Sequence, residues 1–113
     1  TYWQGKCPLT GIGDPALLRA SHIKPWKSCD NDAERLDVHN GLLLSALWDA
    51  AFDKGLVTFD DDGKPIFSEL LSRLAINELR SQTPICLTDD HRIKLAWHRE
   101  KVFKRDGLRE KSV

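Results

Sequence analysis

The sequence predicts an α+β fold in which short strands and short helices share one small core. Three observations carry this prediction. The stretch ALLRASHI at 16–23 is strand-like and ends just before Pro25, and the residue before a proline is held in an extended conformation. Two β-prone runs at 56–59 and 64–67 flank an Asp-Gly turn, a pattern typical of a hairpin. Helix signals follow further along the chain.

The first half of the chain alternates apolar runs with polar connections. KSCDNDAERLDV at 27–38 is polar and predicts a loop. Asn40-Gly41 is a strong turn signal, and the apolar run 42–44 follows it. Ser45 is placed to cap a helix from about 46 to 54.

The second half predicts two further helices. The stretch SELLSRLAINEL at 68–79 has a helical pattern, and Pro84 breaks the chain after it. Thr88 is a good N-cap, because two acids follow it in the first turn. The last helix is then predicted to run to about Arg105.

The length and composition indicate one globular domain. The chain has 113 residues, of which 41% are hydrophobic and 30% charged, which is ordinary for a soluble protein with a modest core. No apolar run approaches the ~20 residues of a membrane span, so we expect no membrane partner. Because the start has no initiator Met, we expect residues 1–113 to be a single domain at the C-terminal end of a longer protein.

The cysteines argue against a structural zinc and against disulfides. There are three, Cys7, Cys29 and Cys86, and no two of them form a CxxC pair. Reduced thiols and a cytoplasmic location are the simplest interpretation.

Basic residues are concentrated at the C-terminal end. The chain has 17 Lys and Arg against 17 Asp and Glu, but residues 91–113 hold eight basic side chains and three acids. On the predicted last helix, Lys94, His98, Lys101 and Arg105 form one stripe. Such a stripe is most often a solvated face. The sharper alternative is contact of Lys94, Lys101 and Arg105 with a DNA backbone.

Two carboxylates on the predicted helix 46–54 indicate a metal site. Asp49 and Asp53 are four residues apart and therefore share one helix face. The other residues from 46 to 52 are apolar, which predicts burial of this helix. Buried carboxylates cost free energy unless they are paired or hold a metal. Hard oxygen ligands suit Mg²⁺ or Mn²⁺ better than zinc.

Two further side chains in this region are candidates for chemistry. His22 lies near the predicted strand end, where a neutral imidazole can take a proton from water. The alternative for His22 is a hydrogen-bonded structural histidine, and the alternative for Asn40 is a plain turn residue. His39 and Asp37 are interpreted as loop residues, with a minor ligand role left open. Taken together, a His base, an ordering Asn and a helix-bound metal make a site for phosphodiester hydrolysis.

These residues resemble a known family. SHIKPW at 21–26, followed by RLDVHNGLLLSALWDAAFDKGLVTF at 35–59, resembles the HNH endonuclease motif in its restriction-type branch. CPLTGI at 7–12 and HREKVF at 98–103 are similar to segments that flank the motif in that branch. The resemblance implies a ββα-metal core, of two strands, a loop and a helix holding one divalent cation. The hairpin and the last helix would be additions to it.

The resemblance also implies a role for each motif residue. His22 matches the general base, and Asn40 matches the Asn that orients the loop carrying it. Asp49 takes the place of the last His of the name, and Asp53 matches the second helical ligand. Asp in place of His favours Mg²⁺ or Mn²⁺, with Ni²⁺ or Zn²⁺ as alternatives. Ser21 stands where many HNH proteins have an acidic or His ligand.

Three functions are consistent with the sequence. The leading hypothesis is a restriction-type, metal-dependent DNA endonuclease. Its zero net charge suggests that other domains of the full-length chain supply DNA affinity, and cutting both strands would need a homodimer. The rival is a catalytically degenerate HNH-fold module for nucleic-acid binding or assembly. The third is an RNA or structure-specific nuclease.

Overall fold

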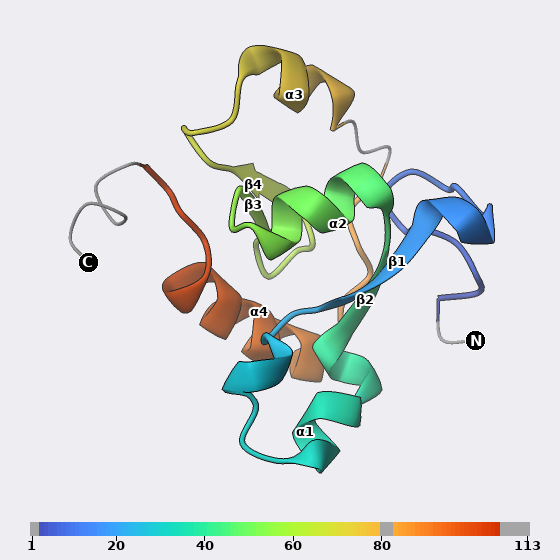
Figure 1. The fold of residues 1–113 in the computed structure, drawn as a ribbon, viewed down its shortest axis with the longest axis vertical. Coiled ribbons are helices and arrows are strands. Elements are labelled where there is room, and N and C mark those ends of the chain that lie inside the picture. The colour runs from blue at the N-terminus through green and yellow to red at the C-terminus, as the bar shows by residue number, and fades with distance from the viewer. Residues whose placement is uncertain (1–2, 80–82, 107–113) are drawn as a thin grey trace.

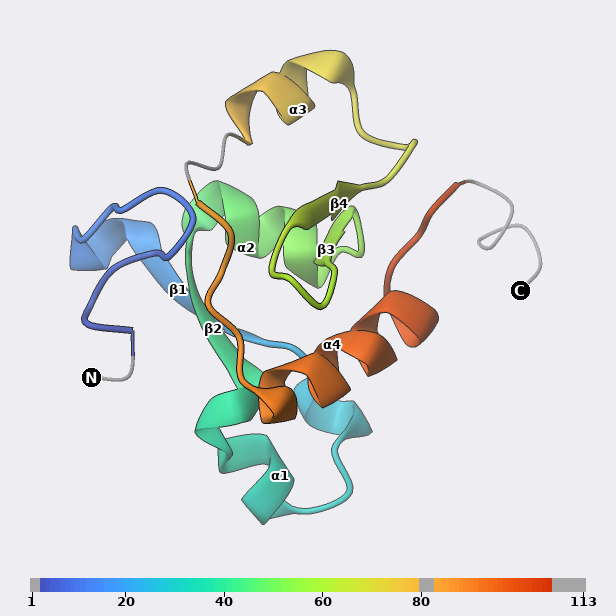
Figure 2. The same cartoon turned by 180° about the vertical axis from the view of Figure 1, so that it is seen from behind.

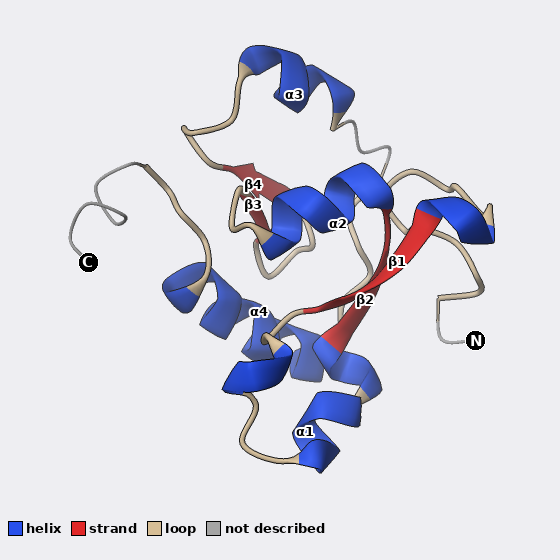
Figure 3. Cartoon of the chain, viewed as in Figure 1, coloured by secondary structure: helices blue, strands red, loops and turns tan. Residues whose placement is uncertain are grey.

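The computed structural model describes residues 3–79 and 83–106. Within these residues, four α-helices and two small antiparallel sheets surround one core (Figure 1, and Figure 3 by element type). The architecture confirms the α+β prediction. No helix in the described part of the chain is long and apolar enough to cross a membrane.

The first sheet joins two strands that lie nearly twenty residues apart in the sequence. Strand β1 (Leu18–His22) confirms the predicted strand, and it pairs antiparallel with β2 (Gly41–Ser45). His22 lies opposite Gly41 in this register. The predicted Asn40-Gly41 turn falls at the end of a short 3-10 helix, η3 (Val38–Asn40), and Gly41 opens β2.

The connection between these strands is more ordered than the predicted loop. It contains a 3-10 helix, η2 (Trp26–Ser28), and a five-residue helix, α1 (Asp32–Leu36). Asn31 caps α1, because its side chain accepts a hydrogen bond from the Glu34 amide at 2.9 Å. A single helical turn has no periodicity for the sequence to reveal.

Helix α2 (Ala46–Asp53) follows β2 directly and packs one side on the core. Trp48, Ala51 and Phe52 are buried, whereas Asp53 is exposed and Asp49 is half-buried. The prediction that this helix is buried on nearly every side is therefore wrong. Its alanines lie largely on the solvent side, where their small apolar surface costs little.

The second sheet is the predicted hairpin. Strands β3 (Val57–Phe59) and β4 (Pro65–Phe67) pair antiparallel, with Val57 opposite Phe67. All three residues of β3 are buried. The hairpin therefore extends the core instead of standing apart from it.

Helix α3 (Arg73–Glu78) begins later than predicted, with Ser72 as its N-cap. Ser68 was predicted to start the helix, but its buried hydroxyl instead donates to the Lys104 carbonyl and accepts from the Leu70 amide. Ser68 thus joins the hairpin to the C-terminal segment, a contact between residues 36 apart that no local pattern indicates.

Helix α4 (Asp89–Lys101) begins at the Thr88 cap as predicted, but it ends four residues before Arg105. The chain after Lys101 turns back onto the end of α2, where the Lys104 amide donates to the Gly55 carbonyl at 2.8 Å. Gly55 has a φ of +73°, and a Cβ there would lie 2.2 Å from the Val102 carbonyl oxygen. Only glycine fits this approach.

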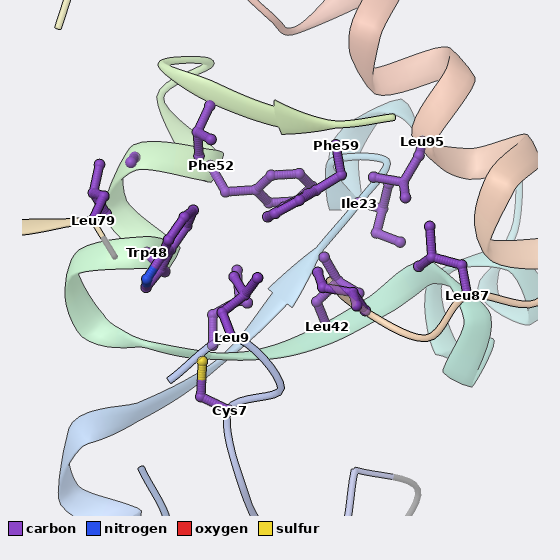
Figure 4. Close-up of a cluster of buried hydrophobic side chains, with 14 residues drawn as sticks. Cys7, Leu9, Ile23, Leu42, Trp48, Phe52, Phe59, Leu79, Leu87 and Leu95 are labelled. Atoms are coloured by element: carbon purple, nitrogen blue, oxygen red, sulfur yellow. The ribbon is translucent and has the colours of Figure 1, made fainter. Parts of the chain in front are cut away.

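The core lies between the first sheet, α2, the hairpin and α4. The aromatic rings of Trp48, Phe52 and Phe59 form its centre, with Trp48 and Phe59 stacked at 6.0 Å between ring centroids (Figure 4). The extended segment 83–88 runs past β2 to the start of α4 (Figure 2) and contributes Ile85 and Leu87. The three cysteines are free, as predicted.

His98 belongs to this core and not to a basic stripe on α4. It is 1% exposed and stacked on Phe52, with 3.9 Å between ring centroids. Its Nε2 lies 3.0 Å from the Phe52 carbonyl and its Nδ1 lies 2.9 Å from the Thr58 hydroxyl. Because a carbonyl only accepts, Nε2 carries the proton and Nδ1 accepts from Thr58. The predicted single stripe is therefore wrong: one member is buried, and Arg105 lies beyond the helix.

We expect the protein to lose stability as the pH falls from about 6.5 towards 4. Burial lowers the pKa of His98 from 6.5 to about 4, so the unfolded chain binds this proton first and protonation favours unfolding in that window. The full effect is about 3 kcal/mol at most. Urea unfolding across this range measures it.

The matched variant is His98→Gln, which does not titrate. Its free energy of unfolding should fall less between pH 6.5 and 4 than that of the wild type. Parallel curves for the two proteins would contradict the assignment to His98.

Candidate active site

His22 is the last residue of β1, and its side chain is exposed. The imidazole meets the Trp26 ring edge-on, with 5.4 Å between centroids and 83° between planes. Within the described residues, no hydrogen bond or ion pair engages this imidazole. Its nitrogens are therefore open to a water molecule, as a general base requires.

Asn40 holds the chain directly after His22. Asn40 is fully buried, and its side-chain oxygen accepts from the Lys24 amide at 2.8 Å while its nitrogen donates to the Lys24 carbonyl at 3.1 Å. Its backbone carbonyl accepts from the Ile23 amide at 2.8 Å. The side-chain nitrogen of Asn40 also lies 3.5 Å from the Cys29 sulfur. This geometry is what an orienting role needs, although the catalytic role itself stays a prediction.

A pair of lysines braces the same loop through Glu34. Lys24 and Lys94 approach the Glu34 carboxylate at 2.9 Å and 2.6 Å. The hydrogen bond from Lys94, and next the one from Lys24, lower the pKa of Glu34 to about 2. Lys94, which was predicted to contact DNA, is thus ion-paired and ties α4 to α1.

The two carboxylates of α2 lie one turn apart and lack a cationic partner. Among the residues that the structure describes, neither Asp49 nor Asp53 forms an ion pair. The hydroxyl of Ser21, on β1, donates to one oxygen of Asp49, Oδ1. Like charges at this spacing repel, and Asp53 ends the helix where the dipole disfavours a negative charge. A bound cation would relieve both effects. The repulsion between the two charges therefore still favours a metal, although the predicted burial of both carboxylates was wrong.

The donor set fits a hard divalent cation with few protein ligands. Across residues 3–79 and 83–106, no group of three or more His, Cys, Asp or Glu side chains could hold a metal ion. Asp49 and Asp53 stay the predicted ligands, and in that case they would be the protein donors of the site. Mg²⁺ is commonly bound in this way, by one or two carboxylates together with waters and substrate phosphates.

The structure links the predicted site residues through their neighbours, and of the predicted DNA-contacting residues only Lys94 is tied to this region, through Glu34. Ser21 touches Asp49 and precedes His22, while Asn40 clamps the backbone that follows His22. Asp53 lies one turn from Asp49 on α2. Lys101 is exposed near the end of α4. The basic residues beyond 106 lie outside the described part of the chain.

Sequence reasoning missed the contacts of Ser21 and Glu34. The alternation of a strand places Ser21 on the face opposite to His22, but it does not say which of the two faces is buried. Nothing in the spacing indicates that the Ser21 hydroxyl meets a helix 28 residues further on, or that Glu34 meets Lys94.

Strands β1 and β2 and helix α2 form a small ββα unit. It carries an exposed histidine and two carboxylates that form no ion pair with any described residue. A family model described as HNH endonuclease matches residues 7–60, which include β1, β2 and α2. This match confirms the resemblance to the HNH endonuclease family over residues 7–60 and indicates a nuclease. No curated protein matches the chain.

Proposed function

We propose that the protein is a metal-dependent DNA endonuclease of the restriction type. One observation supports this most strongly: the Ser21–Asp49 hydrogen bond joins the end of β1, where His22 is exposed, to the carboxylates of α2. The family match over 7–60 supplies the reaction class. Because Ser21 directly precedes His22 on β1, we propose that the base and the acids act on one phosphodiester.

In the proposed reaction, His22 takes a proton from the attacking water, which adds to phosphorus in line with the leaving 3′ oxygen. Asn40 holds the backbone after His22 and so fixes where the imidazole points. Asp49 and Asp53 would hold one Mg²⁺ or Mn²⁺, which supplies positive charge to the phosphate and the leaving oxygen. The Trp26 ring lies beside the imidazole in a T-shaped contact.

The DNA contacts are proposed for the exposed basic residues. Lys101 and Arg105 are exposed, and phosphate contacts from such residues position a duplex without reading its sequence. Lys94 contributes less in this scheme, because it is ion-paired with Glu34, a carboxylate that it shares with Lys24. With a net charge of zero, the chain would depend on other domains or on a second copy for much of its DNA affinity.

The test is cleavage of supercoiled plasmid with Mg²⁺, Mn²⁺, Ni²⁺ or EDTA, with an RNA of equal length as a second substrate. We expect nicking of DNA with Mg²⁺ or Mn²⁺ and none in EDTA. Cleavage that persists in EDTA would refute metal dependence, and cleavage of RNA alone would refute the substrate. DNA binding without cleavage under every condition would favour the degenerate module.

A further inference from the structure

We propose that Ser21 is a positioning residue that sets one oxygen of Asp49 as a metal ligand. This inference rests on the proposed function, because it concerns the same cation. Ser21 is 4% exposed, whereas its neighbour His22 is exposed. The alternation of β1 therefore directs the serine to α2 and the histidine to the solvent.

Strand pairing holds the backbone of Ser21 in place, and this positions its hydroxyl group. Ser21 lies opposite Leu42 in the β1–β2 register, and both neighbours on its strand are paired as well. From this position the hydroxyl donates to Oδ1 of Asp49. An ionised carboxylate has no proton to give, so the serine must be the donor. Such charge-assisted hydrogen bonds are stronger and shorter than neutral ones.

This bond engages only one of the two oxygens of the Asp49 carboxylate. Oδ1 receives the hydroxyl, and within the described residues Oδ2 has no hydrogen bond or ion pair. Oδ2 is therefore the oxygen left for a cation, and the hydroxyl bond limits rotation of the carboxylate. A ligand held in this way loses less freedom when the cation binds.

A serine also keeps the charge of the site low. A carboxylate at position 21 would put a third negative charge against Asp49 and Asp53, with no Lys, Arg or His paired to them in the described residues. The neutral hydroxyl orients Asp49 without adding to this repulsion. Asp49 and Asp53 would then hold the cation, and a substrate phosphate would supply further oxygen ligands.

The experiment measures Mn²⁺ affinity of the full chain without DNA, by calorimetry or by the electron paramagnetic resonance signal of free Mn²⁺. Ser21→Thr and Ser21→Val are nearly equal in shape, both suit a strand, and only the first keeps a hydroxyl. We expect the Mn²⁺ affinity of the Ser21→Thr variant to lie within a few-fold of the wild-type affinity. We expect the Ser21→Val variant to bind Mn²⁺ about 10- to 100-fold more weakly. This is the usual cost of removing a group that hydrogen-bonds to a metal ligand.

Ser45→Ala is the matched control. Ser45 is also buried and adjoins α2, but its hydroxyl makes no capping hydrogen bond to that helix. Its loss should leave Mn²⁺ affinity unchanged. Thermal unfolding in EDTA shows whether each variant is folded, and this readout is independent of the metal.

The outcomes separate the two proposals. Equal Mn²⁺ affinity of folded Thr and Val variants would overturn the role of Ser21 and leave the proposed metal site intact. Absence of Mn²⁺ binding by the wild type would overturn the metal site itself, and the role of Ser21 with it. A weakened Ser45→Ala variant would show that general loss of packing, and not the Asp49 bond, controls affinity.

Discussion

Replacing His22 with alanine should abolish DNA cleavage while leaving Mn²⁺ affinity at the wild-type level. The imidazole is exposed at the end of β1, and no described residue forms a hydrogen bond or ion pair with it, so its removal loses only the edge-on contact with Trp26. Loss of a general base costs roughly 10²- to 10⁴-fold in rate. The metal is held by Asp49 and Asp53 in the proposed site, so its affinity has no reason to change.

The measurement is the initial rate of plasmid nicking with Mg²⁺, alongside Mn²⁺ affinity without DNA. His39→Ala is the control, because His39 lies in the same connection but its ring approaches Asp37 and Asp90 and packs against His91. That variant should retain cleavage. A His22→Ala protein that cleaves at the wild-type rate, or that no longer binds Mn²⁺, would contradict the role of His22 as the base.

Replacing Asp49 with asparagine should abolish Mn²⁺ binding and cleavage together. The amide oxygen can still accept the Ser21 hydroxyl, so the shape and the hydrogen bond survive while the charge is lost. One of the two carboxylates is then missing from the site. We expect a loss of affinity greater than the roughly 10- to 100-fold cost of losing an outer partner.

The matched control is Asp62→Asn, which removes an exposed acid from the β3–β4 turn. It changes the net charge equally and should leave both readouts unchanged. Both variants are measured by Mn²⁺ calorimetry and by plasmid nicking at one ionic strength. Mn²⁺ affinity in Asp49→Asn equal to that of the wild type would refute Asp49 as a ligand, and a parallel drop in Asp62→Asn would indicate a general charge effect.

Local chemistry was sufficient to predict several elements. Pro25 restricts the conformation of the residue before it, and this predicted that the first strand ends before the proline. The Asp-Gly pair marks the turn between β3 and β4, and Thr88 with its two acids marks the start of α4. Each of these signals lies within a few residues of the structure that it determines, which is why the sequence indicated it correctly.

Long-range contacts decided what local patterns left open. Helix α4 stops at Lys101 because the next residues pack on Gly55, and His98 faces Phe52 and Thr58 across the core and not the solvent. The periodicity of the helix placed His98 in a stripe with Lys94, but periodicity does not say which face the rest of the protein will cover.

The same division applies to the candidate site. The sequence by itself determined the residue types and their spacing. These indicated an HNH endonuclease domain and predicted His22, Asn40, Asp49 and Asp53 as its site residues. Only the tertiary structure decided that Asn40 clamps the Lys24 backbone and that Ser21 donates to Asp49. Hydrogen bonds between residues 16 and 28 positions apart depend on how strands and helices pack, and no local preference of the chain encodes that packing.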